Sequence, residues 1–459
     1  MKSPRIYYLV LFSLVLLLVL GGFRCTLFPK NEEKLITQPV QLNWWRLTDN
    51  QNNFSEIINA YTVRRPNISI KVTTFKPEEY EKALVEAWAV DKGPDIVSLP
   101  VGWWRSRQAN LIPVPAELKV PYINIEGIKK EAVAYLGTTK APSVKQLGEL
   151  FTDVVKNDVV IDNKIYGLPL ALDTIVLYYN KDLLNKANLP TPASTWSEFK
   201  NHVAAISLVD KRGNFIQHGT ALGAADNIPL AFELLSTLMM QNGTPMLNAQ
   251  GTKAIFDQAI SGADGEYIPG EDALRFYTDF ANPTKEVYSW TTKEASAQES
   301  FTSGRLAYYF GYASELTTIR QQAPRLNFGI TMFPQIDGSG QPVYYADYNI
   351  EAVAAKTKYP NEAWDFVLFA TTKPEQVTKY LKATGKLTAL RSLVQTQLDN
   401  FDLQEPARQI LSARTWYKGN NLNVAKQAML ALIRAANSGA SLPEALSLAV
   451  KQVNQTLSP

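Results

Sequence analysis

Aromatic and acidic side chains follow two of the strands that the sequence predicts, and their types suit binding better than bond breaking. Trp44 and Trp45 end a strand that begins at Gln41, and Asp49 lies in the loop after it. Trp103 follows another predicted strand in the same way. A flat ring packs against C–H groups, and a carboxylate accepts hydrogen bonds from hydroxyls. These residues therefore favour a site for a small, uncharged, hydroxylated molecule.

Neighbouring side chains on a strand point to opposite faces, so the two tryptophans cannot both reach such a site. We expect Trp45 to face the site and Trp44 to face the core. For Trp103 the alternative is packing within its own loop. Trp45, Asp49 and Trp103 are therefore candidate binding residues.

Known catalytic patterns are absent from the sequence. It contains no G-x-S-x-G, H-E-x-x-H, Walker A or G-x-G-x-x-G pattern. There are two histidines, and His202 lies in a helical stretch where a structural role is the simpler interpretation. The single cysteine, Cys25, excludes an internal disulfide and a cysteine metal cluster. We therefore expect no catalytic residue, no metal site and no cofactor.

The composition is that of a globular protein with two or three domain-sized units. The chain has 459 residues, of which 46% are hydrophobic and 19% are charged. Lys and Arg total 46 and Asp and Glu total 43, which gives a net charge of +3. This near-neutral balance argues against a nucleic-acid partner.

Short strands alternate with amphipathic helices in the first part of the body. The patterns predict strands around residues 41–44, 68–72 and 95–99, with helices between them around 54–61 and 80–88. This order predicts right-handed crossovers and a parallel sheet. Ligands of such sheets bind at the carboxyl ends of the strands, where the tryptophans and Asp49 lie.

The rest of the body is mostly helical by its pattern. A second region opens near Tyr166 and continues with helical spacing to about Ser300. Leu306–Phe310 and Phe328–Met332 read as strands. The C-terminal part, from Asn361 onward, is again helical.

The N-terminal segment, residues 1–25, predicts export from the cytoplasm. Lys2 and Arg5 precede residues 6–23, an uncharged run of 18 residues. Its length lies between that of a signal peptide's apolar core and that of a minimal membrane span. The preceding positive charge places the body outside the cytoplasm. Residues 26–38 are polar and read as a linker.

Three fates of this segment fit the sequence: an uncleaved transmembrane helix, lipidation at Cys25, or simple cleavage. The bacterial lipobox has Leu three residues before the cysteine and small residues at the next two positions. Here those positions hold Gly22, Phe23 and Arg24. The uncleaved helix therefore fits better, and Cys25 is the candidate lipidation site. Either of these two fates tethers the protein to a membrane.

Four stretches occur in an order that resembles a known family. They are GPDI (93–96), GLPLALDTIVLYYNKDLLNKANLPTPASTWSEF (167–199), FTSGRLAYYFGYASEL (301–316) and YPNEAWDFVLFATTKPEQVTKYLKATGKLTAL (359–390). Together they resemble the extracellular solute-binding proteins of ABC importers, in the group that includes maltose-binding protein. The resemblance covers about residues 41–457. It has one departure at Lys386-Leu387-Thr388, where the family usually has a proline after the glycine.

The resemblance implies an α/β fold of the type II periplasmic-binding-protein class, preceded by the transmembrane or signal helix. Two lobes, each a mixed or parallel sheet flanked by helices, close on the ligand by a hinge. We expect the chain to cross between the lobes at residues 168–173, 328–334 and 382–390. The implied lobes are 39–172 with 335–384 for the N-lobe, and 173–334 with 385–459 for the C-lobe.

The resemblance also implies ligand contacts on several loops. It places a ligand-binding acid at Asp173 on the first crossing and an aromatic residue at Tyr312. For the loop that holds Asn227, the alternative is a helix cap. Tyr345 and Asp347 precede a strand and would face the cleft. The full set of ligand-binding candidates is Trp45, Asp49, Trp103, Asp173, Asn227, Tyr312, Tyr345, Asp347 and Trp416.

A bacterial protein of this kind captures a small solute between its lobes and delivers it to an ABC permease. We expect a carbohydrate ligand, because acids bind hydroxyls and aromatic rings bind sugar faces. We expect a monomer, tethered at the extracytoplasmic face of the cell membrane. Two alternatives differ in role: a sensor that presents its ligand to a membrane receptor, and an exported glycan-active enzyme. The fold alone does not identify the ligand.

Overall fold

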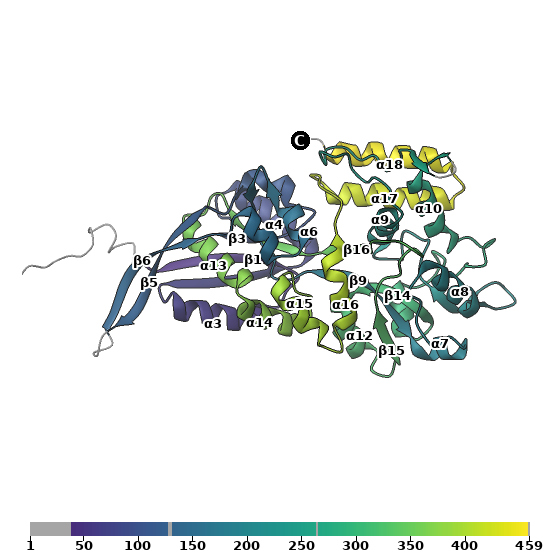
Figure 1. Cartoon of the computed structure of the whole chain (residues 1–459), viewed down its shortest axis with the longest axis horizontal. Helices are drawn as coiled ribbons and strands as arrows, with labels where there is room; N and C mark the ends of the chain where they lie inside the picture. Colours follow the sequence, from purple (N-terminus) through teal and green to yellow (C-terminus); the bar gives the residue numbers. More distant parts are fainter. Residues whose placement is uncertain (1–37, 127–130, 263–264, 458–459) are drawn as a thin grey trace, which may run out of the picture.

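The computed structural model describes residues 38–126, 131–262 and 265–457 and shows an elongated molecule of two lobes (Figure 1). Each lobe is built on a β-sheet that helices cover, so the predicted two-lobed α/β fold is confirmed. The predicted anchor with Cys25, and all of the linker except residue 38, lie outside the described residues. Within the described ranges, no helix is both long enough and apolar enough to cross a membrane.

The first lobe contains a five-stranded sheet in the order β2-β1-β3-β17-β4. Both β2 and β3 run parallel to β1, as the alternation of strands and helices predicts. Strand β17, the last of these strands in the sequence, is antiparallel to β3. The strands are β1 (Val40–Leu47), β2 (Ile68–Phe75), β3 (Ile96–Pro100), β4 (Leu111–Ile112) and β17 (Asn349–Ala354).

Amphipathic helices pack on this sheet. In α4 the buried residues are Tyr80, Leu84 and Trp88, whose spacing of four places them on one face. The helices of this lobe are α3 (Ser55–Arg64), α4 (Pro77–Ala89), α5 (Val144–Leu150), α6 (Asp153–Val159), α13 (Pro360–Thr372), α14 (Pro374–Thr384) and α15 (Arg391–Leu398), with the 3-10 turns η1 (Gln51–Phe54) and η2 (Trp104–Asn110).

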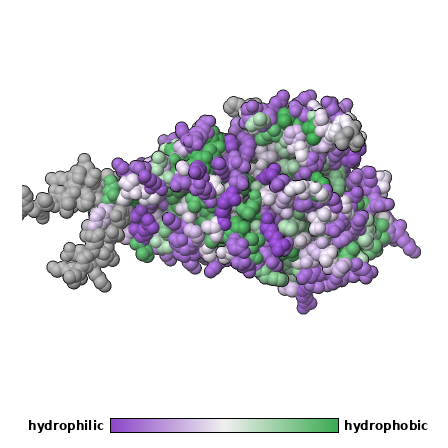
Figure 2. All heavy atoms as spheres, in the orientation of Figure 1, coloured by the Kyte–Doolittle hydropathy of each residue, from purple (hydrophilic) through white to green (hydrophobic). Residues whose placement is uncertain are grey.

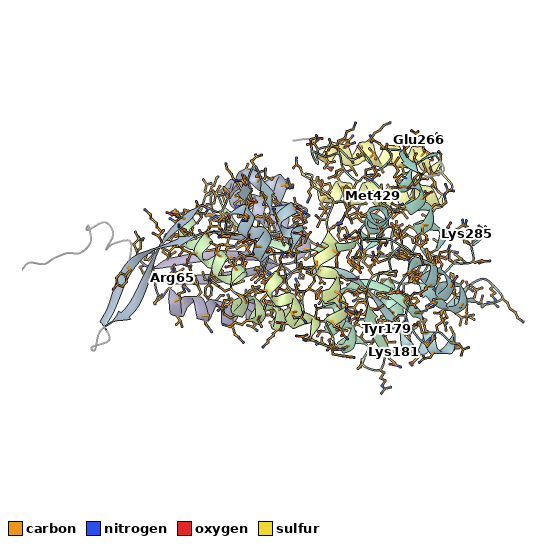
Figure 3. All side chains as sticks on the ribbon, viewed as in Figure 1. Arg65, Tyr179, Lys181, Glu266, Lys285 and Met429 are labelled. Atoms are coloured by element: carbon orange, nitrogen blue, oxygen red, sulfur yellow. The ribbon has the colours of Figure 1, made fainter. Side chains whose placement is uncertain are left out.

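A buried ion pair ties α3 to α13. Arg65, labelled in Figure 3, donates from Nε to Asp365 at 3.0 Å, and the Tyr61 hydroxyl donates to the same carboxylate at 2.9 Å. Arg65 and Asp365 are 300 positions apart in the sequence. The first lobe is therefore discontinuous, because the chain returns to it after building part of the second.

A β-hairpin projects from the first lobe at the end remote from the second lobe (Figure 1). Its strands, β5 (Glu117–Glu126) and β6 (Glu131–Lys140), pair in antiparallel register along their whole length. Leu118 and Val120 at its base are buried. A shorter hairpin of β7 (Val160–Ile161) and β8 (Lys164–Ile165) precedes the first crossing. The sequence patterns predict neither hairpin.

The second lobe contains a seven-stranded sheet in the order β10-β11-β14-β9-β16-β18, with β15 also paired to β9. The central strand β9 is antiparallel to β14, β15 and β16. The strands are β9 (Asp173–Asn180), β10 (Leu208–Val209), β11 (Phe215–Thr220), β14 (Leu306–Tyr312), β15 (Phe328–Thr331), β16 (Tyr344–Asp347) and β18 (Ala413–Arg414).

The strand β9 lies in a region that the sequence predicts to be mostly helical. Seven of its eight residues are buried, so its run DTIVLYYN shows no alternation of apolar and polar residues. The two strands predicted after residue 300 are confirmed as β14 and β15. A small hairpin of β12 (Ile260–Gly262) and β13 (Gly265–Tyr267) lies outside the sheet.

Helices cover the second sheet, and the C-terminal pair α17 and α18 packs along one side of this lobe (Figure 1). Hydrophilic side chains occupy most of the face seen in Figure 2, so much of the apolar core is covered. The helices are α7 (Lys181–Lys186), α8 (Trp196–Ile206), α9 (Ala231–Gln241), α10 (Pro269–Asp279), α11 (Ala297–Thr302), α12 (Leu316–Gln322), α16 (Gln404–Gln409), α17 (Leu422–Asn437) and α18 (Leu442–Leu457), with the 3-10 turns η3 (Ala313–Glu315) and η4 (Ile410–Ser412).

The first two crossings between the sheets are set by strand pairing. Leu168 bridges to β17 in the first lobe, and β9 begins at Asp173 in the second. The second crossing lies at Tyr348, between β16 and β17. The sequence predicts it earlier, at residues 328–334, but that segment forms β15 and stays in the second sheet. A short apolar strand shows the same residue pattern in either sheet. Only its hydrogen-bonded partner strand shows which sheet it belongs to.

The third crossing also lies later than predicted. Helix α15 packs on the first lobe, where Arg391 donates to Asp153 at 2.6 Å. Helix α16 packs on β9, where Gln409 donates to the Thr174 hydroxyl at 2.8 Å. The crossing is therefore the loop 399–403 rather than residues 382–390. The lobe boundaries predicted at 335 and 385 move accordingly.

Candidate functional site

A cavity of about 130 Å³ lies where the crossing strands meet. The end of β1, the start of β9, the turn η3 and the segment that joins β16 to β17 line it. Because both lobes and two crossings contribute, its shape changes whenever the lobes move. The polar residues that matter most in its lining are Arg46, Asp173, Tyr312, Asp347, Glu351 and Lys386.

Three of the sequence candidates, Asp173, Tyr312 and Asp347, meet in this cavity. Asp173 and Asp347 are direct cross-strand partners on β9 and β16. Residues paired in this way lie on the same face of the sheet, with Cβ atoms about 4.5–5.5 Å apart. The two carboxylates therefore stand side by side, one on each of the first two crossings.

Asp173 is 6% exposed and accepts hydrogen bonds from the backbone N–H groups of two residues. Thr174 donates at 3.0 Å, and Ser314 donates at 3.3 and 3.4 Å to the two oxygens. Burial raises the pKa of Asp173 to about 7. The charged form is thus poorly stabilised by the chain, and a donor from a ligand would stabilise it.

The Asp347 side chain is exposed and lines the cavity. The protein atoms around its carboxyl group partly desolvate it, and this raises its pKa above the ordinary value. Two lysines oppose the shift, Lys426 with the larger effect and Lys386 with the smaller. Its carboxylate accepts no hydrogen bond from another side chain in the part of the chain described. It therefore has capacity to accept hydrogen bonds from a solute.

On the first-lobe side, the cavity is lined by a buried network around Arg46. The guanidinium is 2% exposed and forms ion pairs with Glu351 and, at 2.6 Å, with Asp49. It lies over the rings of Phe54 and Tyr380, at 4.8 and 5.7 Å from their centroids. Arg46 lies at the end of β1, which explains how a charge reaches the interior at this point.

Glu351, on β17, receives a donor at each oxygen. Trp44 Nε1 donates to Oε2 at 2.8 Å, and Ser98 Oγ donates to Oε1 at 3.1 Å beside the Arg46 contact. Trp44 is buried and faces the core, as strand alternation predicts. Burial still raises the pKa of Glu351, although Arg46 opposes the shift.

Asp49 belongs to this network rather than to the open cavity. Its Oδ2 accepts from Arg46 and, at 2.8 Å, from the Tyr380 hydroxyl, while Oδ1 accepts from Asn53 at 2.8 Å. Burial disfavours its charge, but the Arg46 guanidinium outweighs burial and lowers the pKa of Asp49. The sequence therefore identified an acid beside the site, and the structure assigns its hydrogen bonds to the protein itself.

Lys386 lines the cavity and was not among the sequence candidates. It lies beside the bridge between Leu172 and Leu387, which holds it against the first crossing. Its positive charge favours ionisation of Asp49, Asp173 and Asp347. It forms no ion pair with a described carboxylate. The signal in the sequence was its position, where the family resemblance expects a proline.

A larger cavity, of about 340 Å³, lies between α12 of the second lobe and α14 and α15 of the first. It shares Ser314 with the smaller one but gathers mainly leucines, threonines and amides in its wall. The smaller cavity is the better candidate for recognition, because the carboxylates with unused hydrogen-bonding capacity lie there.

The model of the bacterial extracellular solute-binding proteins matches residues 56–402 of this chain. The chain belongs to this family. The match covers both lobes and the first two crossings, so it confirms the resemblance that the four stretches indicate.

The curated relatives of this solute-binding protein include two that are named for sugars. A galactooligosaccharide-binding protein of Bacillus subtilis is 23% identical over 263 residues, which cover 54% of this chain and 55% of that protein. A multiple sugar-binding protein of Streptococcus mutans is 27% identical over 241 residues, which cover 52% of this chain and 54% of that protein. The chain thus spans about half the length of the curated relatives it matches.

A solved structure extends the likeness to the whole body. The cyclic α-maltosyl-1,6-maltose-binding protein of Arthrobacter globiformis has a TM-score of 0.71 and 20% identity, over 91% of this chain and 99% of that chain. At this identity the likeness establishes the shared two-lobed fold.

Two tryptophan candidates of the solute-binding protein do not line the cavity. Trp45 packs against Phe75 with ring centroids 4.6 Å apart, and the hydroxyl of Tyr80 on α4 donates to its backbone oxygen at 3.3 Å. Trp103 is half-buried in the loop after β3. The neighbouring Gly102 packs closely against Leu422 of α17, because a Cβ atom added to this glycine would lie 2.7 Å from the leucine side chain. This loop of the first lobe therefore touches the second lobe.

Two candidates in the second lobe, Asn227 and Tyr345, contact other residues of that lobe rather than the cavity. The Asn227 amide donates to Thr291 O at 2.8 Å and to Glu294 O at 3.1 Å, and its oxygen accepts from Trp290 at 3.0 Å. Tyr345 is 7% exposed and belongs to the apolar core of the lobe. Neither side chain lines the cavity at the crossings.

Trp416 is 4% exposed and donates from Nε1 to Ser236 Oγ at 2.9 Å. It packs between Phe232 and Phe256, with ring centroids 5.9 and 6.2 Å away. In this arrangement its ring is part of the core of the second lobe. Of the sequence candidates, Asp173, Tyr312 and Asp347 line the cavity. Arg46, Glu351 and Lys386 line it as well, although they were not identified from the sequence.

Proposed function

We propose that this protein captures a carbohydrate between its lobes and delivers it to an ABC permease as a non-enzymatic binding protein. The observation that carries the proposal is the cavity at the crossings, which Asp173, Asp347 and Tyr312 line together. Carboxylates bind sugar hydroxyls, and a tyrosine ring binds a C–H face.

The comparisons support a carbohydrate without identifying one. Two relatives are named for galactooligosaccharides and for multiple sugars, and the similar solved structure is named for a cyclic maltosyl-maltose. The carboxylates also argue against a phosphorylated solute, because like charges repel in a water-poor cavity. The usual ligand cavity of roughly 300–1,000 Å³ is larger than the present one, so the lobes must open to admit a sugar chain.

We also propose that the N-terminal segment tethers the protein to the outer face of the cell membrane. A tether raises the effective concentration of a binding protein at its permease. The sequence supports two anchors, an uncleaved helix and a lipid at Cys25. In fractionated cells, Cys25→Ser would leave the protein in the membrane if the helix is the anchor and release it to the medium if the lipid is.

Calorimetric titration of the full chain with a panel of sugars tests the carbohydrate proposal. The panel contains maltotetraose, galactooligosaccharides, and amino and N-acetylated disaccharides, with sn-glycerol 3-phosphate and a dipeptide as other solute classes. We expect saturable binding of at least one sugar, with a smaller radius of gyration in small-angle scattering as the lobes close. Binding of glycerol phosphate or the dipeptide, with no response to any sugar, would contradict the proposal.

A further inference from the structure

We infer that the solute carries a protonated amino group, which binds between Asp173 and Asp347, as in an amino sugar. This inference rests on the proposed carbohydrate-binding function and names the class of sugar. It concerns the charges of the cavity and how they are balanced within the chain.

The cavity holds more negative charge than the chain neutralises. Arg46 is occupied by its ion pairs with Glu351 and Asp49. That leaves Asp173 and Asp347. Lys386 acts on both at longer range, and Lys426, whose ion pair is with Glu233, also acts on Asp347. No ion pair joins either of these two carboxylates to a cation in the described parts of the chain.

The geometry of the pair suits an ammonium group. The two carboxylates are cross-strand partners on one face of the sheet. An ammonium group has three N–H donors and can bridge two carboxylates with charge-assisted hydrogen bonds. Tyr312 lines the same cavity, and an aromatic ring can also attract a cation.

A second observation points to a ligand atom of the opposite kind. Arg46 is 2% exposed and lines the cavity, and its Nε–H has no acceptor among the described residues. A buried donor without an acceptor is costly. Protein atoms cover this nitrogen, so a solute oxygen reaches it only in a more open arrangement of the lobes. A solute with one amino group and nearby hydroxyls would then supply both the cation and the acceptor.

The second lobe adds to the negative field. Glu233 on α9 is 4% exposed, accepts from Lys426 at 2.6 Å through one oxygen, and has no donor at its other oxygen in the described chain. Its charge helps raise the pKa of Tyr312 after the larger effect of burial. Lys426 of this lobe also acts on Asp347, but its ion pair is with Glu233, so the second lobe compensates the carboxylate pair only in part.

A metal ion fits this site less well than an organic cation. The described residues contain no group of three or more His, Cys, Asp or Glu side chains able to hold one. Calcium takes about six to eight oxygen ligands, and two carboxylates fall short of that number.

The test compares two disaccharides of equal length, one with free amino groups and one with N-acetyl groups, by calorimetry on the full chain at about pH 7. We expect the amino form to bind about tenfold tighter or more, because it makes charge-assisted hydrogen bonds that the acetylated form lacks. In Asp347→Asn the two disaccharides should bind within about threefold of each other. Asp226→Asn, which removes an exposed carboxylate that does not line the cavity, should keep the difference.

A second measurement on the unmodified protein does not depend on the variant folding. Repeating the titration in buffers of different ionisation enthalpy shows whether binding releases protons. We expect release with the amino sugar, because an ammonium group beside Asp173 lowers its pKa from about 7. We expect little release with the acetylated sugar.

Three results would overturn the inference. They are equal or tighter binding of the acetylated disaccharide, an equal loss of both sugars in Asp347→Asn, and saturable binding of calcium chloride with none of the amino sugar. Binding of other sugars with neither disaccharide would also reject the amino group and leave the proposed function standing. Failure of every sugar in the panel would instead reject the proposed function.

Discussion

Two acid clusters border the same cavity, and they differ in how the chain satisfies them. In the first lobe, Glu351 receives donors from the side chains of Arg46, Trp44 and Ser98. At the crossings, Asp173 accepts from backbone N–H groups and has no cation paired with it, and Asp347 receives no side-chain donor from the described residues. Carboxylates occupy both places, but the chain's own donors differ.

This difference separates a structural role from a binding role. A carboxylate whose oxygens are all paired within the protein has little capacity left for a solute, and removing its partner leaves a buried charge. A carboxylate with unused capacity gains stabilisation when a ligand brings donors. We therefore propose that the Arg46 network stabilises the fold and that the Asp173–Asp347 pair recognises the solute.

The largest expected effect comes from breaking the structural cluster. Arg46→Met would leave Glu351 buried without its counter-ion, and we expect the free energy of unfolding to fall by about 3–5 kcal/mol. Urea unfolding at constant pH measures it. Arg434→Met is the matched control, since it breaks the exposed pair with Asp226 and should cost less than about 1 kcal/mol. Equal stability of the two variants would show that the network is not structural.

A smaller effect, with a pH signature, is expected at the crossings. The folded pKa of Asp173 is raised from 3.8 to about 7, so the folded state holds its proton more tightly than the unfolded state. The contribution of Asp173 to stability is therefore present below pH 3.8 and is lost as pH rises to about 7. Asp173→Asn removes this loss.

We expect Asp173→Asn to gain stability relative to the unmodified protein as pH rises through this window, by roughly 1–4 kcal/mol in total. Urea unfolding at several pH values from about 4 to about 8 measures the difference. If the difference in unfolding free energy between the two proteins stays constant across this pH range, Asp173 does not titrate there. The two acid clusters would then not differ in the way their charges are stabilised.

The smallest effect tests a candidate that lies outside both clusters. Trp416→Phe keeps an aromatic ring but removes the donor to Ser236, so we expect a loss of about 1–2 kcal/mol in stability. Sugar affinity in the calorimetric titration should stay unchanged, because Trp416 belongs to the core of the second lobe. A fall in affinity of about tenfold without loss of stability would return Trp416 to the binding site.

The sequence predicted the parts of this protein that depend on local pattern. The strands β1, β2 and β3 and the helices between them follow from apolar spacing, and Trp44 faces the core as strand alternation requires. The order of the four stretches along the chain was sufficient to indicate the family. Asp173 was found because the family resemblance places a ligand-binding acid at the first crossing.

Local pattern could not assign strands that are buried on both faces or that change their partner. The run at β9 lacks alternation because nearly all its residues are buried. The segment at β15 has the pattern of a crossing strand, but it pairs with β9 in the second sheet. The position of Trp416 in the chain predicted a residue of the cleft, but its ring packs in the core of the second lobe.

What the sequence determined by itself is the strands and helices at the start of the first lobe, the family that the chain resembles, and a set of candidate acids and rings. Only the tertiary structure decided which of those acids are neutralised. The reason is physical, because the charge of a buried carboxylate depends on donors that come from distant parts of the chain. Arg46 and Glu351 are 305 positions apart, and no local sequence pattern predicts that they form an ion pair. Asp173 and Asp347 meet in the same way, but without a described cation paired to either of them.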